Sequence, residues 1–575
     1  MKYFSNFYQS NKKILTVVIF PCVLFFYPFL TVNQGVDVSD SLYSLTNFRF
    51  FPEMEGMWIV STYVSNVIGY LLTKLPFGTT VLGMKWYTGI FVSLTSVTAY
   101  SFFRKWMPAW ICFLGQLIAV SYCWIPTGIL YNYLTYFFFT IGLLFLYKGL
   151  VEEKNSCLLA AGFFLGVNLF VRIPNLTQIS LIAGAWYYLW IKKTKLRKIF
   201  GKTAYCISGY LLGMIIPLMG ILMQYGISGL AEMITGLGGV GEQDGSYTLF
   251  GMILSTFQAY ARTSKWVMLM VLGIFMGTAM FLCCKGRWEV LKKASYLLGI
   301  LVLLRFLWGR GMFTFRYYED YTSMYEWGMI ALYLAWIGAG YLLISSKSSQ
   351  EEKLWAVFSA IVLAITPLGS NNYTYQNLNN MFFIAPVTVY TYVKLLRRRE
   401  KRRLADRVSF PWKAMVTVLG LMILIQGIGF HQNFVFRDGM DGQKREYRFQ
   451  QPAVLAGMKT TVENGEELSG LLKHLDKSSD GNRLLLLGDC PGLSFLTGMA
   501  PAIHTAWPDL ESESYGKIEK QLQEMEEYPV VIIREKEYIT EQGKKKKQLV
   551  EEYVSSNHYR LTYESGRYFV FEKKE

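Results

Sequence analysis

The chain is poor in the residues that build disulfide frameworks and metal sites. Its 575 residues include 8 cysteines and 4 histidines. All the cysteines except Cys490 lie in or beside apolar runs, a spacing that gives neither a disulfide framework nor zinc ligation. So few histidines argue against a histidine-rich metal site. No internal repeat of roughly 20 to 50 residues is visible, so a repeat architecture is not expected.

Long apolar runs recur over the first three quarters of the chain. Apolar residues make up 52% of the sequence and aromatic residues 16%. Runs of about 17 to 22 apolar residues are typical of membrane-crossing helices. The sequence therefore predicts a polytopic α-helical membrane protein with about 13 transmembrane helices. The predicted spans are 14–30, 81–103, 108–125, 130–146, 157–171, 176–191, 204–225, 266–284, 295–308, 327–344, 355–368, 381–396 and 414–430.

Basic residues gather in short clusters beside these runs. The net charge is +16, but the clusters form no continuous stripe, so we interpret them as topology signals and expect no nucleic-acid partner. With the predicted spans they all fall on one side, which the positive-inside bias assigns to the cytoplasm. The clusters are Lys12-Lys13, Arg104-Lys105, 192–198, 285–293 and 397–403.

The first apolar run is not followed by a small-residue cleavage site, so we expect an uncleaved anchor. The chain is thus predicted to be a multi-pass protein of the cytoplasmic (plasma) membrane, of bacterial origin. Its amino terminus is expected inside and its carboxyl terminus outside.

Residues 57–72 form an apolar stretch that would reverse this topology if it crossed the membrane. Its apolar residues follow helical spacing, while Ser61, Ser65, Asn66 and Gly69 occupy the other face. We predict a helix in the outer interface. It follows a first outer loop at 31–56, and both belong to a predicted transmembrane catalytic domain, 1–430.

Charge rises and apolar runs shorten after the last span. Residues 431–575 are predicted to form a small extracytoplasmic α/β domain. The pattern favours strands at 483–488 and 529–533, helices at 517–528 and 544–555, and a hairpin at 559–572 that turns at Ser565-Gly566.

The first outer loop carries the acidic stretch Gly35-Val36-Asp37-Val38-Ser39-Asp40-Ser41-Leu42-Tyr43. Its two carboxylates, Asp40 and Asp37, are the best catalytic candidates in the sequence. The alternative is a solvated loop in which Asp40 caps a short helix, since Leu42, Leu45 and Phe48 follow at near-helical spacing.

This organisation resembles the GT-C superfamily of integral-membrane glycosyltransferases. Within it, Asp40-Ser41-Leu42-Tyr43-Ser44-Leu45 is similar to the acidic motif of the protein-mannosyltransferase and aminoarabinose-transferase branch. That branch usually has a second acidic residue directly after the Asp, where this chain has Ser41. Arg172-Ile173-Pro174-Asn175 and Gly488-Asp489-Cys490-Pro491 are further segments of similar style.

The resemblance implies transfer of a sugar from a polyprenyl-phosphate donor at the outer leaflet, with inversion, to a glycan, lipid or protein acceptor. An acceptor hydroxyl is a poor nucleophile near neutral pH, so a carboxylate must accept its proton. Asp40 is our first choice for this base and Asp37 our second. The resemblance leaves a divalent cation (Mg²⁺ or Mn²⁺) open, and no third metal ligand is evident in the sequence.

A lipid-phosphate leaving group needs cations at the membrane surface. Arg172, Arg305 and Arg316 are the candidates. The first two lie within or at the ends of spans, where a charge is costly unless paired or hydrated, and Arg316 lies among aromatic residues that could stack on a sugar. Their structural alternative is an ion pair with Glu319 or Asp320. Lys85, near the start of a span, is expected to reach lipid headgroups.

Aromatic, acidic and amide side chains supply the candidates for substrate binding. They are Tyr43, Tyr317, Glu319, Asp320, Asn371 and Asn372. The glycine-rich segment 235–245 lacks a phosphate-binding fingerprint. A flexible outer loop that closes over substrate, and plain disorder, are equally compatible with it.

Two other functions remain open. A polytopic transporter or flippase of a polyprenyl-linked glycan or solute would also bury charge, but would usually show internal pseudo-repeats, and none is visible. A polysaccharide polymerase or ligase would be expected to concentrate its chemistry in a large central loop.

Overall fold

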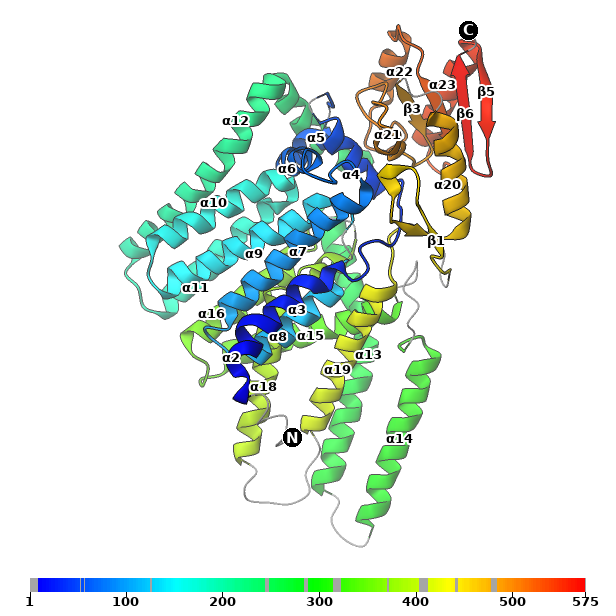
Figure 1. Ribbon diagram of the computed structural model, residues 1–575. Coiled ribbons are helices and arrows are strands. Elements are labelled where there is room, and N and C mark those ends of the chain that lie inside the picture. Colours follow the sequence, from blue (N-terminus) through cyan, green and yellow to red (C-terminus); the bar gives the residue numbers. More distant parts are fainter. Residues whose placement is uncertain are drawn as a thin grey trace.

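The computed structural model describes residues 9–51, 53–55, 57–124, 127–243, 248–283, 288–313, 322–369, 372–402, 412–439, 443–476 and 483–573. A bundle of long helices forms one end of the molecule and carries the amino terminus, while strands and shorter helices form the other end (Figure 1). The bundle and the helices beside it are α2 (Lys12–Ile14), η1 (Leu15–Ile19), α3 (Phe20–Phe26), η2 (Tyr27–Phe29), α4 (Asp40–Arg49), α5 (Met57–Ser61), α6 (Tyr63–Thr73), α7 (Val81–Phe103), α8 (Ala109–Tyr122), α9 (Leu130–Val151), α10 (Asn155–Val171), η3 (Ile173–Ser180), α11 (Leu181–Ile191), α12 (Leu196–Gln243), α13 (Leu249–Cys283), α14 (Glu289–Gly309), α15 (Thr322–Ile344), α16 (Gln350–Ile365), α17 (Tyr375–Asn379), α18 (Ile384–Arg402) and α19 (Trp412–Asn433).

A helix occupies each segment that was predicted to cross the membrane. By length and composition, 6 helices in the described part of the chain qualify as membrane spans. They are Lys12–Phe29, Leu130–Val151, Leu196–Gly236, Leu249–Met280, Ser323–Ile344 and Trp412–Asn433. The protein is thus a multi-pass helical membrane protein, and the number of 13 crossings stays a prediction.

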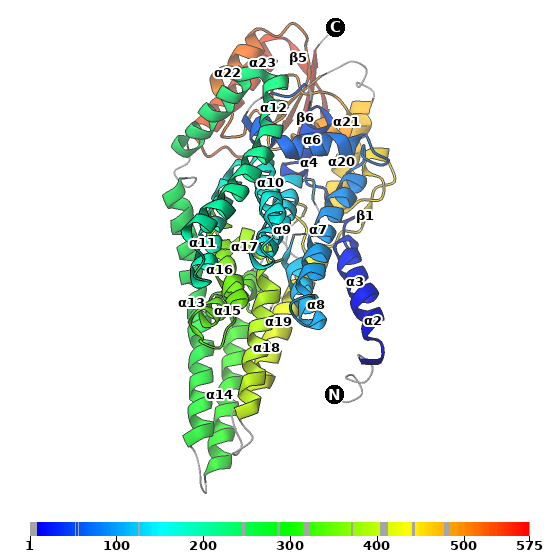
Figure 2. The ribbon, with the colours of Figure 1, turned by 90° about the vertical axis from the view of Figure 1, so that its left-hand side faces the viewer.

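Residues 57–73 do not cross the bundle. Helices α3 and α7 lie side by side and antiparallel, since Tyr100 donates to Thr16 O (2.7 Å) at one end and Phe29 stacks on Trp86 (4.5 Å between ring centroids) at the other. Everything between them, including α5 and α6, therefore starts and ends on the same side. Figure 2 shows α4 and α6 lying across that end of the bundle.

Four of the five basic clusters lie in two pairs at helix ends. Arg104 donates to Thr16 O (3.1 Å), close to Lys12-Lys13. Gln350 donates to Ile191 O (3.4 Å), and Arg398 to Lys347 O (2.8 Å). These contacts gather the 192–198 and 397–403 clusters at neighbouring helix ends, as the positive-inside interpretation requires. Which face lies in the cytoplasm stays a prediction.

Glycines let α10 and α12 touch at backbone distance. A Cβ at Gly162 or Gly166 would lie 2.0 or 2.1 Å from carbonyl oxygens of α12, and a Cβ at Gly209 or Gly213 would meet α10 equally closely. Paired small residues four apart are a common packing motif of membrane helices.

The glycine-rich segment 235–245 is not a loop where it is described. Helix α12 turns at Gly226, whose φ of 67° breaks the regular helix one residue after the predicted span ends, and then continues to Gln243. Residues 244 and 245 lie outside the described part of the chain. The prediction failed because glycine lowers helix propensity without forbidding a helix.

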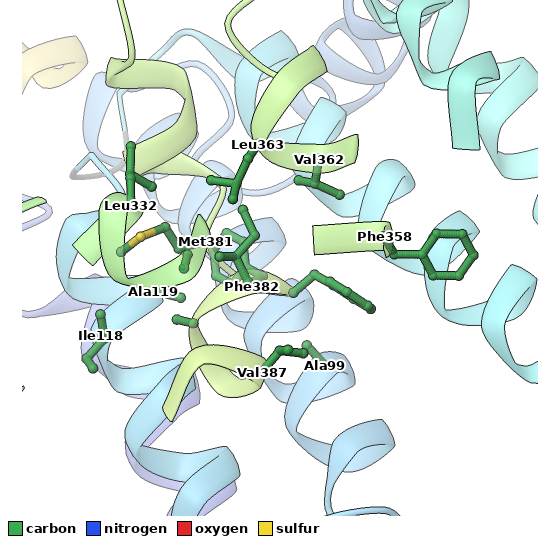
Figure 3. Close-up of a cluster of buried hydrophobic side chains, with 14 of the residues drawn as sticks. Ala99, Ile118, Ala119, Leu332, Phe358, Val362, Leu363, Met381, Phe382 and Val387 are labelled. Carbon is green, nitrogen blue, oxygen red and sulfur yellow. The ribbon is translucent and has the colours of Figure 1, made fainter. Parts of the chain in front are cut away.

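The bundle core brings α7, α8, α15, α16 and α18 together. Figure 3 shows apolar side chains from these helices, among them Ala99, Ala119, Leu332, Val362 and Val387, gathered in one cluster. Such packing fixes the helix ends that carry the polar residues described below.

The last part of the chain folds around a four-stranded sheet of order β3-β4-β6-β5. Strands β3 and β4 are parallel, and β6 is antiparallel to both β4 and β5. Strand β3 is four buried leucines, as expected of a strand covered on both faces. The elements are β1 (Tyr447–Arg448), η5 (Ala453–Leu455), β2 (Lys459–Thr460), α20 (Val462–Leu475), β3 (Leu484–Leu487), α21 (Leu493–Thr497), α22 (Tyr515–Gln523), β4 (Val530–Arg534), α23 (Glu541–Ser556), β5 (Tyr559–Glu564) and β6 (Tyr568–Lys573).

One apolar cluster joins this sheet region to α4. Leu42 and Leu45 of α4 are buried in the same cluster as Leu493, Phe495 and Leu468. Arg49 donates to Phe495 O (2.9 Å), and Thr46 donates to Pro491 O (3.0 Å). Helix α4 is therefore held between the bundle and the sheet region.

Candidate functional site

The segment that precedes α4 is tied to residues more than 400 positions away. Gly35 donates to Lys459 O and Lys459 donates to Asn33 O, both at 2.8 Å. Val36 donates to Asp438 Oδ2 (3.0 Å), 402 residues along the chain. From the bundle side, Lys85 donates to Gln34 O (2.6 Å). The acidic stretch is thus a clamped segment, not a solvated loop.

Asp37 caps α4. Its carboxylate accepts hydrogen bonds from the backbone N–H of Ser39 (2.9 Å) and Ser41 (2.8 Å), and the residue is only 5% exposed. Burial raises the pKa of Asp37, and these hydrogen bonds oppose that shift. Because both of its oxygens accept hydrogen bonds at the start of the helix, Asp37 positions Asp40.

Asp40, in the first turn of α4, presents an accessible carboxylate. Its Oδ2 lies 2.8 Å from Arg437 Nη1, and 35% of its side chain is exposed. Desolvation by the surrounding protein raises the pKa of Asp40 to about 6, while the Arg437 guanidinium lowers it and the charges of Asp37 and Asp489 raise it. A base works best when its pKa lies near the operating pH. Asp40 is accessible, whereas Asp37 is buried and hydrogen-bonded, so Asp40 is the better placed of the two to accept a proton.

Arg437 was missed in the sequence. It follows the last bundle helix by four residues, and its φ of 47° turns the chain back toward α4. Its Nη1 also donates to Ser39 Oγ (3.2 Å). The available signal was a basic residue just after the last predicted span, on the side where basic residues are uncommon.

Trp507, Asp489 and Lys536 form a second polar cluster, which faces α4 from the sheet region. Tyr43 meets Trp507 edge to face (5.3 Å between ring centroids), and Trp507 Nε1 donates to Asp489 Oδ1 (3.1 Å). Lys536 Nζ lies 2.8 Å from the same oxygen. Tyr43, predicted to bind substrate, lies one turn after Asp40 on the same helix. The nearby Cys490 is only 1% exposed, so its thiol is not accessible to a substrate.

Arg172 lies in a different polar pocket. Its Nη2 donates to Gly369 O (2.6 Å), and its guanidinium lies 5.6 Å from the centre of the Tyr131 ring. The pocket walls are mostly amides and hydroxyls, contributed by Asn132, Thr135, Tyr136, Asn175, Thr177, Gln178, Thr366, Gln376 and Asn380. Val171, which precedes Arg172, is buried in the same apolar cluster as Leu42 and Leu45 of α4, so this pocket lies near the Asp40 helix.

Two other predicted site residues, Arg305 and Asn372, are not brought to Asp40. Arg305 is exposed on α14, and Asn372 is exposed after α16. Neither makes a hydrogen bond or ion pair with α4 in the described part of the chain. Arg316, Tyr317, Glu319, Asp320 and Asn371 lie outside the described residues.

No metal centre forms among the described residues, since nowhere in those ranges do three or more His, Cys, Asp or Glu side chains gather as ligands. Asp40 and Asp489 are paired with Arg437 and Lys536 instead. Carboxylates already paired with cations do not fit a divalent cation.

Lys85 was predicted to reach lipid headgroups, but the structure buries it. The residue is 6% exposed, and its ammonium donates to Gln34 O and Gly35 O (3.4 Å). The prediction was wrong because the partner is a backbone segment 50 residues away, which spacing along a helix does not indicate.

Lys85→Met is expected to loosen the segment before α4. Hydrogen bonds to a charged group contribute about 1.5–3 kcal/mol each, so the melting temperature should fall and proteolysis near residue 35 should accelerate. Lys74→Met is the matched control, because Lys74 is exposed and its ammonium lies over the Tyr70 ring without a hydrogen bond or ion pair to the described residues. Equal melting temperatures for the two variants would contradict the clamp.

Comparisons with known proteins find similarity at the level of structure alone. No family model matches the chain, and no curated protein does. Among solved structures, the chain is similar to ArnT from Cupriavidus metallidurans bound to undecaprenyl phosphate, at 11% sequence identity and a TM-score of 0.42. The alignment covers 96% of this chain and 97% of ArnT.

Proposed function

We propose that the protein is a membrane glycosyltransferase that moves a sugar from a polyprenyl-phosphate donor to an acceptor hydroxyl at the outer face of the membrane. The observation that carries the proposal is the Asp40 carboxylate, held at the end of a membrane-embedded bundle beside Arg437. A base and a phosphate-binding cation side by side match the two demands of this reaction.

In the proposed reaction, Asp40 accepts the proton of the acceptor hydroxyl as its oxygen bonds to the anomeric carbon. The bond between that carbon and the phosphate oxygen breaks at the same time, which inverts the configuration and releases polyprenyl phosphate. Asp37 and Lys85 hold the start of α4 so that the Asp40 carboxylate is positioned in advance.

Arg437 has a separate role in this scheme. Its side chain is 53% exposed, so a phosphate can reach the guanidinium that now pairs with Asp40. Guanidinium binds phosphate in a bidentate manner. Transfer of Arg437 from Asp40 to the donor phosphate would free the carboxylate at the moment when the base is needed. Arg172, in the adjoining amide-lined pocket, is proposed to bind the donor head group.

The pH dependence follows from the Asp40 carboxyl. Only the ionised form accepts a proton, so kcat/KM should fall about tenfold per pH unit below the Asp40 pKa of about 6. Because the phosphate would withdraw Arg437, whose charge lowers this pKa, the acidic limb of kcat should lie at higher pH than that of kcat/KM. Initial rates between pH 4.5 and 8 would measure both, and identical limbs would exclude the transfer of Arg437.

Reconstitution tests the function itself. The purified protein in lipid nanodiscs would be incubated with a panel of undecaprenyl-phosphate hexoses and pentoses, and release of undecaprenyl phosphate would be followed by mass spectrometry. Release by the wild type and its loss in Asp40→Asn supports the proposal. Movement of intact carrier across a vesicle membrane without cleavage would instead show a flippase.

A further inference from the structure

Two strand ends of the sheet region face the Asp40 site. Strands β3 and β4 are parallel and pair in register from Leu484 with Val530 to Leu487 with Ile533. Their carboxyl ends therefore lie at one edge of the sheet, where open α/β sheets commonly bind ligands. Asp489 follows β3 and Lys536 follows β4 at this edge.

The backbone after β3 is shaped to present Asp489. Gly488 and Asp489 both have positive φ, 94° and 55°. A Cβ at Gly488 would lie 2.0 Å from Arg534 O, so only glycine permits this approach to β4. Non-glycine residues with positive φ are uncommon and cluster at functional sites.

Asp489 is held in place by groups on its own side of the site. Its Oδ1 accepts from Trp507 Nε1 (3.1 Å) and from Lys536 Nζ (2.8 Å). Lys536 also reaches Asp509 Oδ2 (3.3 Å), and the buried Oδ1 of Asp509 has no hydrogen-bond partner within the described residues. Asp489 Oδ2 makes no hydrogen bond within the same ranges, and 31% of the Asp489 side chain is exposed.

The loop that carries Asp489 is bonded directly to the segment that leads into α4 and Asp40. Gly492 donates to Val38 O (2.9 Å), and Trp507 packs against Tyr43, which lies one turn after Asp40. After burial and the Arg437 and Asp37 charges, the Asp489 charge is a further influence on the pKa of Asp40, which it raises. Two partly exposed carboxylates, each with one oxygen bound by a cation, thus lie on segments that contact each other through the Gly492–Val38 hydrogen bond and the Tyr43–Trp507 ring pair.

Resting on the function proposed above, we infer that Asp489 orients the acceptor and that the acceptor is a carbohydrate. Asp40 would accept from the attacking hydroxyl, while Asp489 Oδ2 accepts from a second hydroxyl of the same sugar ring. A serine or threonine side chain has one hydroxyl and would leave Asp489 unused. Asp489 gains and loses no proton in the step, so it is a binding residue and not the base.

The inference is tested by comparing how much of the donor reacts with water and how much with a sugar acceptor. Donor cleavage would be measured in nanodiscs with the active undecaprenyl-phosphate sugar, first with water alone and then with an equimolar mixture of methyl α-glucoside, α-mannoside and α-galactoside. A capped serine peptide provides the single-hydroxyl acceptor. Asp489→Asn should keep the slow cleavage by water and lose about 10- to 100-fold in kcat/KM for the glycosides, the effect of one hydrogen bond to a charged group.

The possible results separate the two proposals. Absence of cleavage by the wild type with every donor would overturn the glycosyltransferase function and this inference with it. Cleavage by the wild type, with transfer to glycosides unchanged in Asp489→Asn or equally good transfer to the serine peptide, would overturn the inference alone. A merely structural role for Asp489 would lower the melting temperature and water-dependent cleavage together with transfer. Glu541→Gln, which removes an exposed carboxyl of the same region, is the matched control.

Discussion

Asp40→Asn should lower the rate of sugar transfer by about 10²- to 10⁴-fold, the usual contribution of a positioned general base. The amide has the same shape as the carboxylate but cannot take a proton from the acceptor hydroxyl. Arg437 would lose an exposed ion pair, which contributes little to stability, so the melting temperature should barely change. Steady-state rates and thermal unfolding of the same preparation measure the two effects.

Asp37→Asn separates catalysis from capping. It removes the same charge three residues earlier, from a carboxylate that accepts the backbone N–H of Ser39, just before α4, and that of Ser41 in its first turn. The asparagine oxygen can still accept one of them, but its NH₂ would face the other donor. We expect a lower melting temperature and a smaller loss of transfer than for Asp40→Asn. A reversed order, with Asp37→Asn the less active variant at equal stability, would assign the base to Asp37.

The sequence predicted those features that depend on local pattern. Apolar runs located the bundle helices, and the buried leucines of β3 and the Ser565-Gly566 turn located strands of the sheet region. Asp37 and Asp40 became candidates because both lie within one short polar segment between apolar runs, and their catalytic role stays a prediction. The alternative that Asp40 caps the helix was wrong, because Ser39 is the N-cap and the side chain that accepts the Ser41 N–H is that of Asp37.

The remaining site residues depend on contacts between distant segments. Nothing in the sequence around Arg437 and Asp438 shows that this segment, which follows the last bundle helix, lies against residues 36–40, which follow the first one. That proximity follows from packing of the first and last helices, where Tyr27 lies against His431 (4.5 Å between ring centroids). Lys85 was misplaced for the same reason. Had the helix neighbours been known, a cation and a carboxylate directly after the last span would have been obvious candidates.

Asp438→Ala is expected to have the largest effect on stability. The buried Asp438 carboxylate accepts from Val36 N (3.0 Å), Thr460 Oγ1 (2.6 Å) and Asn464 Nδ2 (2.7 Å), and thereby joins three segments of the chain. Each buried donor left without a partner costs about 1–3 kcal/mol, so the loss should be several kcal/mol. Thermal unfolding should begin at a markedly lower temperature, with early proteolysis between residues 31 and 39.

Asp438→Asn keeps the shape of the side chain but removes its charge and one acceptor oxygen. The amide keeps one acceptor oxygen for Thr460 and Asn464, while its NH₂ replaces the acceptor of Val36 N–H. If the clamp positions Asp40, this variant should lose transfer activity more than stability, because the segment leading into α4 is released while the rest of the sheet region stays bonded. Arg437, the residue before Asp438, would move with it, so the acidic limb of kcat/KM should also shift. An unchanged pH profile together with full activity would show that Asp40 is positioned by Asp37 and Lys85 alone.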